Sequence, residues 1–473
     1  MTEHISNRKD GLVADQNQPE ASQSWHWNSK QLLGLSPDVM TVKATARLID
    51  PARWELLGQN DTFIWGLLSR PNLSPHKIFV RLADLTGECS CISTKHPCKF
   101  LIALLVLFAD NKSLFAVQQT PEWVKDQLLP QTSSRHQSSI TELNEIQAGM
   151  AEFGRWLRDQ ARQGIANFAE RQAADLESMA NRLIDAHMPR IANDLRELGK
   201  TACPPKGHPP DNWPEILIKG FGKFYLLTQA WKRYDRLSLA EQNDLIRACV
   251  FSTAKSNLQL AVSSILSVDT HLNSDIVTDR WMVLGRRFET FGKNWVRRTW
   301  LYGLDSQRFA VLEDGVSGRR RLLSNLVTGS IYSVSVRFEA GTTAFIGRPV
   351  EIPIPIHIPA AASLLTSPKL DFIKIETDFI KALTANPWLR VWPMILNSVR
   401  LQIDKHHEQW LVVDEQGQSI PVQNGAGIGW YLLAASSGRP IRLFGEWSAD
   451  GLHLVSVFYE ENWLDLTVWG SRP

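Results

Sequence analysis

Three of the five cysteines in this 473-residue chain lie close together, as Cys89, Cys91 and Cys98. Because Cys89 and Cys91 are two residues apart, both thiols can turn toward one ion where a strand bends at its end. Cys98 stands at the start of a predicted helix, where the helix dipole and Lys99 favour the thiolate form. Three thiolates and one nitrogen make the closed tetrahedral shell of a structural zinc site, which can supply much of the folding free energy of a small module.

The residues around the cysteines predict an α+β module over 25–129. Residues 63–68 and 77–82 have the composition of strands, and the turn 69–76, with its two prolines, joins them as a hairpin. Pro97 suits the first position of a helix, and the apolar run that follows, to residue 109, predicts a buried helix.

The rest of the chain changes from helical to alternating patterns. One stripe of apolar residues steps by three and four, as Leu143, Ile146, Met150, Phe153 and Leu157, and a second stripe runs from Leu176 to Leu195. From Asp279 onward, short alternating segments are separated by turns, which predicts strands. We therefore predict an α+β multidomain protein with a flexible tail at 1–24, the zinc module at 25–129, a helical middle domain at 140–270, a mainly antiparallel β domain at 278–350 and a C-terminal α/β or β region at 351–473.

The order of strand, strand, Cys-x-Cys, loop, Cys-x-ligand and apolar helix resembles a SWIM zinc finger, whose pattern is Cys-x-Cys, spacer, Cys-x-His. Cys89, Cys91 and Cys98 match the three cysteine positions, but Phe100 stands where the family has histidine. His96 is the nearest replacement, and it completes the shell if the loop from Lys95 to Pro97 folds over the ion. Water or an exogenous ligand is the second alternative. The third is a degenerate finger in which Phe100 packs in the core.

The likeness to bacterial SWIM zinc finger family proteins extends along the chain to about residue 350. It is carried by Trp27-Asn28, Pro121 to Val124, Phe153 to Asp159, Asp279 to Gly285 and Arg297 to Leu301. The resemblance implies zinc binding and a role in contacting DNA or protein. It also implies an AAA-type ATPase or a von Willebrand factor A domain protein as a partner. We therefore expect Cys89, Cys91, Cys98 and His96 to be zinc ligands.

The region 278–350 offers a second candidate binding surface, with 12 basic and 6 acidic residues. Arg286, Arg287, Arg297 and Arg298 alternate with Phe288, Trp295 and Trp300, and single-stranded nucleic acid is bound by such charges and rings. The alternative, which we prefer, is an antiparallel sheet with Trp and Val inside and Arg on a solvated face. Arg297 and Arg298 point to opposite faces of a strand, so they cannot belong to one patch.

Composition narrows the class of protein. The net charge of +2 is not that of a polybasic nucleic-acid coat protein. The N-terminus has no apolar core of a signal peptide, and the apolar run from Leu101 to Ala109 is too short to span a bilayer, so we expect a cytoplasmic protein without a membrane partner. No phosphate loop, nucleophile elbow or dinucleotide fingerprint is present in the sequence.

The leading interpretation is a non-enzymatic, zinc-binding protein–protein interaction module. The first alternative is a DNA-binding protein that uses the finger and the basic strands of 278–350. The second is an enzyme with an unfamiliar site in the β region. Cys203 and His208 could bind a metal but more simply belong to an ordinary loop, and Cys249 is expected in the core.

Overall fold

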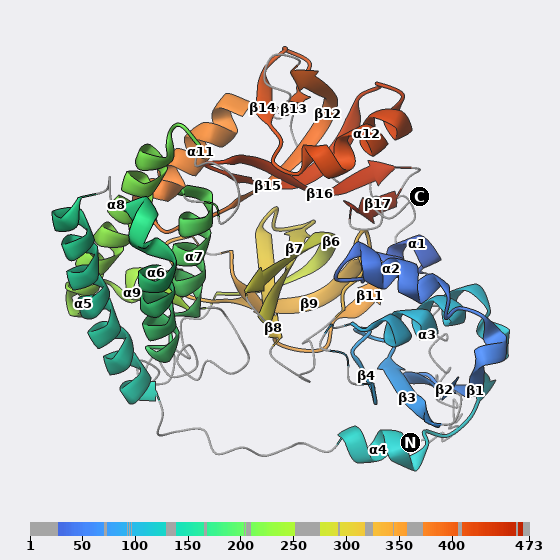
Figure 1. The fold of residues 1–473 in the computed structure, drawn as a ribbon. Helices are drawn as coiled ribbons and strands as arrows, with labels where there is room; N and C mark the ends of the chain where they lie inside the picture. The colour runs from blue at the N-terminus through green and yellow to red at the C-terminus, as the bar shows by residue number, and fades with distance from the viewer. Residues whose placement is uncertain are drawn as a thin grey trace, which may run out of the picture.

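The computed structural model describes residues 27–70, 73–91, 93, 95, 97–128, 139–164, 168–202, 204, 210–250, 275–291, 294–316, 325–343, 345–356, 372–404, 409–459 and 462–466. They form three antiparallel-rich sheets and a helical bundle (Figure 1), so the predicted α+β multidomain class is confirmed. The tail predicted at 1–24 lies outside the described residues. Among those residues, no helix is both long and apolar enough to cross a membrane.

The N-terminal module, blue in Figure 1, is a sheet covered by a buried helix. Its elements are α1 (Ser29–Leu33), α2 (Val39–Ala46), β1 (Trp54–Gln59), β2 (Phe63–Arg70), β3 (Leu73–Arg81), β4 (Gly87–Cys89), α3 (Lys99–Asp110), β5 (Ala116–Val117) and α4 (Glu122–Leu128). The strands are ordered β4-β3-β2-β1-β5. All eight residues from Leu101 to Phe108 are buried, because α3 packs between the sheet and the pair α1 and α2.

The strands of the β2–β3 hairpin are longer than the sequence indicated. Residues 69–76 were expected to form a turn, yet β3 begins at Leu73 and includes Pro75 and His76. The strand tolerates Pro75 because the β2–β3 register is irregular between Leu68 and Arg70, where a missing N–H breaks no regular ladder. His76 is therefore a strand residue, paired with Leu68.

The helical bundle, green in Figure 1, buries both predicted apolar stripes in one core. Its helices are α5 (Ser139–Gln163), α6 (Phe168–Asp185), α7 (Pro189–Ala202), α8 (Trp213–Trp231) and α9 (Leu239–Cys249). The second stripe is divided between two helices, because the chain turns at His187, whose φ is 62°, and Pro189 begins α7. Cys249 is fully buried against Trp231, as predicted.

The central sheet is buried on both faces. Its strands are β6 (Ile276–Phe291), β7 (Asn294–Gly303), β8 (Phe309–Val316), β9 (Ile331–Phe338), β10 (Gly347–Pro349) and β11 (Ile354–Ile356), in the order β10-β9-β6-β7-β8 with β11 also on β9. Met282 and Leu284 join a core shared with the C-terminal sheet, whereas Trp281 and Val283 join a core on the opposite face. Neither face of this sheet is therefore broadly solvated.

The C-terminal region forms the third sheet, at the top of Figure 1. Its elements are α11 (Phe372–Ala385), β12 (Trp392–Asp404), β13 (Gln409–Val413), β14 (Ser419–Pro421), α12 (Gly425–Ser436), β15 (Ile441–Ser448), β16 (Gly451–Tyr459) and β17 (Asn462–Asp465), with the strand order β14-β13-β12-β15-β16-β17. Ile395, Phe444 and Val455 from this region pack on the central sheet.

The N-terminal module lies beside the central sheet (Figure 1), and buried polar contacts join the two. Asn325 donates to the carbonyl of Leu85 over 2.7 Å, and Arg286 donates to the carbonyl of Gly34 over 2.5 Å. Gln31 donates to the carbonyl of Thr328 over 3.3 Å. Since the Leu85 contact directly precedes β4, the strand that carries Cys89 is anchored to the rest of the molecule.

Candidate metal centre

The three predicted cysteine ligands come together in space. The sulfur atoms of Cys89, Cys91 and Cys98 all lie within 4.8 Å of one another, and Cys91 and Cys98 are buried. A tetrahedral zinc site with Zn–S bonds of about 2.3 Å has sulfurs about 3.8 Å apart, so the arrangement fits a metal with little movement. These cysteines could therefore hold a metal ion. Within the described ranges, no other three histidine, cysteine or acidic side chains converge in this way.

Each sulfur is positioned by a different piece of local structure. Cys89 is the last residue of β4 and pairs with Ile78 of β3. Cys91 follows where the strand ends, and Cys98 is the N-cap of α3, with φ −77° and ψ 161°. Pro97 lies just before the N-cap rather than at the first helical position as predicted. The cluster thus joins the end of a strand to the beginning of a helix.

The electrostatics of the cluster favour one thiolate that the other thiols stabilise. Hydrogen bonds from Cys89 and then Cys98 hold the pKa of the Cys91 thiol well below its usual range, although burial opposes this. The pKa of the Cys89 thiol is raised because its hydrogen bonds to Cys91 and Cys98, together with burial, stabilise the protonated form. A divalent cation would replace these shared protons and release them on binding.

The loop from Lys95 to Pro97, which was expected to bring His96 to the ion, is anchored by an ion pair at Lys95. Lys95 forms an ion pair with Asp38 at 2.6 Å, and Asp38 also caps α2 by accepting from the Thr41 amide over 2.8 Å. His96 itself lies outside the described residues. Its predicted role as a zinc ligand stays a prediction.

A second histidine, which the sequence pattern did not single out, lies beside the cluster. His76 is only 8 % exposed, and its ring lies 4.6 Å from that of Phe100, centroid to centroid. Burial and the nearby Arg70 lower the pKa of His76, while the Cys91 thiolate acts in the opposite sense. The β3–β4 pairing brings this residue to the cysteines, because His76 lies on β3 and Cys89 ends the neighbouring strand β4.

Phe100 is partly buried against the core of the N-terminal module. Its place next to His76 explains how an apolar ring fits where the finger pattern has histidine. Phe100 therefore packs against the core, as the alternative of a degenerate finger assumed. The three cysteine sulfurs nevertheless converge as a metal site requires.

The basic residues of 278–350 do not lie as either interpretation expected. Arg286, Arg297 and Arg298 are buried rather than on a solvated face, because both faces of the central sheet are covered. Arg297 pairs with Asp314 at 2.5 Å, and Arg298 pairs with Glu313 at 3.1 Å. Lys293 and Arg319 to Arg321 lie outside the described residues. The three buried guanidinium groups are not available to bind phosphate.

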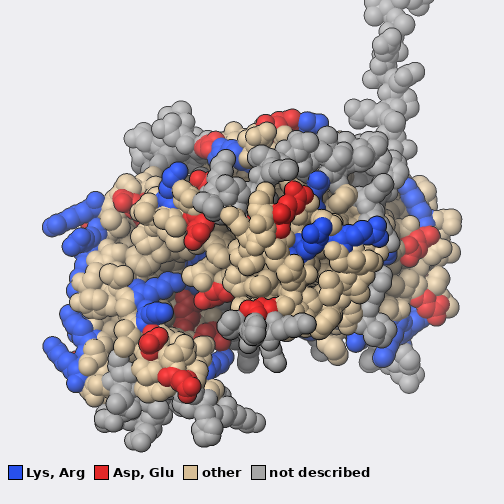
Figure 2. Space-filling model, turned by 90° about the horizontal axis from the view of Figure 1, so that it is seen from above, with Lys and Arg blue, Asp and Glu red and all other residues tan. Residues whose placement is uncertain are grey.

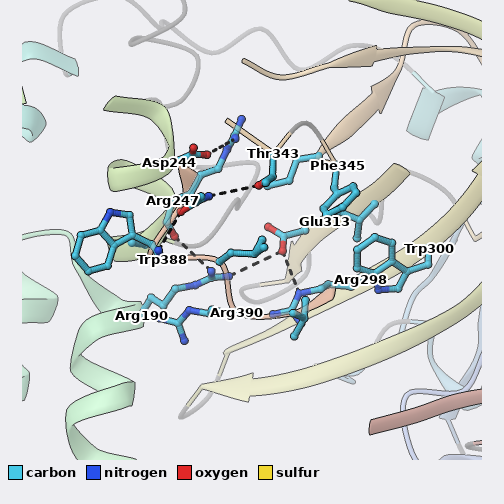
Figure 3. A pocket seen from close by; sticks show the side chains of 16 residues that line it. Arg190, Asp244, Arg247, Arg298, Trp300, Glu313, Thr343, Phe345, Trp388 and Arg390 are labelled. Carbon is cyan, nitrogen blue, oxygen red and sulfur yellow. Dashed lines mark hydrogen bonds and ion pairs between the residues drawn. The ribbon is translucent and has the colours of Figure 1, made fainter. Parts of the chain in front are cut away.

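A cavity of about 90 Å³ lies where the bundle, the central sheet and the segment before β12 meet (Figure 3). Four arginines and two acids line it: Arg190, Arg247, Arg298, Arg390, Asp244 and Glu313. Carboxylates accompany the arginines, since Arg390 pairs with Asp194 at 2.5 Å and Arg247 with Glu339 at 2.8 Å. The cavity is thus lined by ion pairs that link three parts of the fold.

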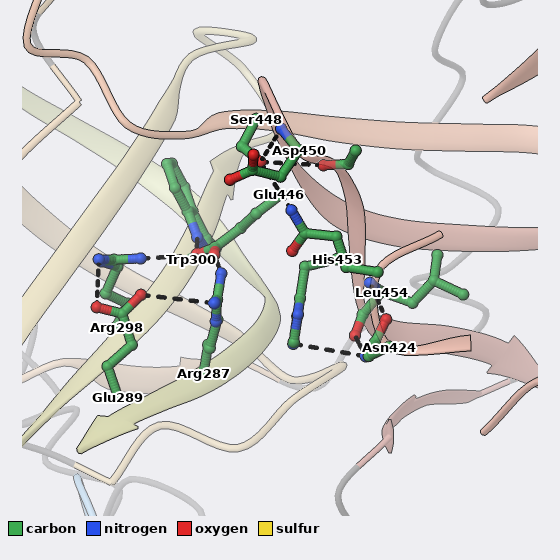
Figure 4. A network of polar contacts seen from close by, with 12 residues as sticks. Arg287, Glu289, Arg298, Trp300, Asn424, Glu446, Ser448, Asp450, His453 and Leu454 are labelled. Atoms are coloured by element: carbon green, nitrogen blue, oxygen red, sulfur yellow. Dashed lines mark hydrogen bonds and ion pairs between the residues drawn. The ribbon is translucent and has the colours of Figure 1, made fainter. Parts of the chain in front are cut away.

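A related network joins the central and C-terminal sheets (Figure 4). Glu446 is fully buried and accepts from Arg287 over 2.5 Å and from Trp300 over 2.7 Å. Although burial opposes ionisation, Arg298 and Arg287 lower the pKa of Glu446. The network therefore ties β15 of the C-terminal sheet to β6 and β7 of the central sheet.

One comparison with known proteins gives a match. Residues 142–249, from the first turn of α5 to the end of α9, match the family model of the SWIM-associated four-helix bundle domain. No curated protein and no solved structure shows significant similarity to the chain. The matched bundle follows the N-terminal module that carries the three clustered cysteines, so the chain combines a SWIM-associated domain with a cysteine cluster that could hold a metal ion.

Proposed function

We propose that the protein is a non-enzymatic, zinc-binding interaction protein in which the metal centre shapes a surface that a partner protein recognises. The observation that carries the proposal is the convergence of Cys89, Cys91 and Cys98. Thiolate ligands favour zinc among the common divalent cations, and a fourth protein ligand would close the shell and make the site structural. The SWIM-associated bundle over residues 142–249 supports the same reading.

The surface around the cysteines has a basic and aromatic character suited to an acidic protein segment. Lys95 and Lys99 are exposed there. The ammonium of Lys99 lies 5.0 Å from the ring centroid of Phe100. We call the surface formed by these two lysines and Phe100 the basic rim. Zinc would orient the rim, because it would fix the end of β4 to the start of α3.

Metal analysis of the purified full-length chain tests the zinc centre. Wild type should carry about one zinc per chain, and Cys98→Ser should lose it. Cys249→Ser is the matched control, since Cys249 is also fully buried but belongs to the bundle core. Wild type without bound zinc after purification and zinc reconstitution, or equal zinc in Cys98→Ser and wild type, would overturn the proposal.

Lysine-directed cross-linking tests the rim. The zinc-loaded chain is cross-linked in extracts of its native cells, and the family resemblance leads us to expect an AAA-type ATPase or a von Willebrand factor A domain protein. Cross-links should concentrate on the rim, and Lys99→Glu should reduce partner recovery while Lys219→Glu, on the exposed side of α8, should not. Cross-links that occur only on the bundle would contradict the assignment.

The DNA-binding alternative predicts a different result. A DNA complex made through lysines should weaken steeply as salt rises, which a gel-shift series measures directly. Figure 2 shows basic and acidic side chains interspersed on the face seen from above, not one continuous basic area. Together with the burial of Arg286, Arg297 and Arg298, this favours a protein partner.

A further inference from the structure

A zinc ion held by three thiolates needs a fourth ligand to complete a tetrahedral shell. Phe100 cannot supply it, and His96 lies outside the described residues. The other donors near the cysteines are side chains on the face of β3 and β4 that Cys89 shares.

The strand register places His76 on that face. Ile78 pairs with Cys89, the last residue of β4, and the amide of Ser90 donates to the carbonyl of Lys77 over 3.0 Å, so the chain that leaves β4 runs alongside the His76 end of β3. Directly opposed residues of an antiparallel pair have Cβ atoms about 5 Å apart, and their side chains lie on the same side of the sheet, as for Ile78 and Cys89. His76 and Ile78 alternate with Lys77, so the two share a face with Cys89.

The surroundings of the His76 ring leave one nitrogen available. Nδ1 lies 3.4 Å from the hydroxyl of Ser90, a long contact that leaves Nε2 as the nitrogen for a metal. Histidines that bind metals usually make such a contact through the other ring nitrogen, which fixes the tautomer and the ring orientation. His76 as a whole is 8 % exposed, so it is largely shielded from competing water.

We propose that His76 is the fourth ligand of the metal, through Nε2, and that it replaces the histidine that Phe100 displaced. The inference rests on the proposed zinc centre. Phe100 contacts the His76 ring, so the aromatic ring and the imidazole occupy adjacent places beside the cysteines. The ring nitrogens of His76 lie outside the 4.8 Å grouping of the sulfurs, so the ring turns toward the ion on binding. Its broad χ2 distribution permits that rotation.

X-ray absorption at the zinc edge tests the assignment on the zinc-loaded full-length chain. Wild type should show three sulfurs and one imidazole, whose outer-shell scattering identifies histidine. His76→Ala should lose the imidazole signal and bind zinc at least about tenfold more weakly in competition with a chromophoric chelator. His96→Ala is the matched control and should keep both properties. The double variant His76→Ala, Phe100→His should regain the imidazole signal, because position 100 adjoins the lost ring.

The outcomes separate this inference from the proposed function. Loss of imidazole in His96→Ala but not in His76→Ala would make His96 the ligand. A wild-type spectrum with oxygen in place of imidazole would exclude His76 as well. In both cases zinc remains bound, so the result contradicts only the assignment of His76 and leaves the proposed zinc centre supported. Absence of zinc from the wild-type chain would overturn the centre itself. If His76→Ala does not fold, the nitrogen shifts of the His76 ring in zinc-loaded wild type decide the question, because a metal-bound Nε2 resonates differently from a free one.

Discussion

Replacing Glu446 with glutamine should loosen the C-terminal sheet from the central sheet. The Glu446 carboxylate is fully buried, 2.5 Å from a nitrogen of Arg287 and 3.5 Å from one of Arg298. Glutamine keeps the volume and can still accept from Trp300, but it removes the negative charge and points amide hydrogens at guanidinium donors. Breaking one partner of a buried charge pair costs about 3–5 kcal/mol.

The lower end of that range applies to this site. Arg298 retains Glu289 at 2.8 Å and Glu313 at 3.1 Å, and Arg287 is 24 % exposed, so water can solvate it in the variant. We therefore expect a cost of about 3 kcal/mol, which is roughly a 100-fold increase in the population of the undocked state.

Amide hydrogen exchange followed by mass spectrometry measures this local opening. Peptides from β15 and β7 should exchange about 100-fold faster in Glu446→Gln, while peptides from the bundle should not change. Glu197→Gln is the matched control: Glu197 is 56 % exposed and pairs with Lys200 at 2.7 Å, so its loss should cost no more than about 0.5 kcal/mol. Exchange in β15 and β7 within about threefold of wild type would show that the buried network contributes little to the docking of the two sheets.

Three further perturbations have defined outcomes. In α12, Gly429→Ala should destabilise the C-terminal sheet by about 1–3 kcal/mol, because the new Cβ would lie 2.4 Å from the Trp410 ring. Gly427→Ala in the same helix meets nothing within 4 Å and should raise the denaturation midpoint, and equal effects of the two would contradict the packing argument. Burial and the nearby Arg287 lower the pKa of His453 from 6.5 to about 4. The unfolded state therefore binds this proton more tightly than the folded state does. The free energy of unfolding should be highest above pH 6.5 and should fall by about 3 kcal/mol as the pH drops toward 4. Urea titrations of wild type and His453→Gln across that range should diverge by this amount, and parallel curves would exclude the effect. Chelation of the proposed zinc at pH 7 should accelerate exchange in β4 and the first turn of α3 but not in α5 to α9, and uniform exchange would show that zinc does not hold this module together.

Local pattern was sufficient to predict the cysteine cluster. The spacing of Cys89, Cys91 and Cys98, together with the apolar run after Cys98, predicted three sulfurs between a strand end and a helix start, and the structure brings them together. The same local rules found the apolar stripe of α5, because a period of 3.6 residues is set by the helix itself.

Local pattern was insufficient where a residue's environment depends on distant strands. His76 was not recognised as a strand residue, because the two prolines in 69–76 indicated a turn. The β2–β3 register, which places His76 in a strand, cannot be deduced from the sequence alone. Alternation correctly placed Arg297 and Arg298 on opposite faces, but it could not show that both faces are covered. Glu446, which accompanies Arg298, lies 148 residues further along the chain.

The amino-acid sequence by itself therefore determined the types of element, the helical and β portions of the chain, and the three thiols that meet at the end of β4. Tertiary structure alone decided which charges are buried, which carboxylates neutralise them, and which described histidine lies beside the cysteines. The physical reason is the separation along the chain over which each interaction acts. Hydrophobic period and cysteine spacing act over a few residues, whereas strand register and the docking of one sheet on another join residues that are far apart in the chain.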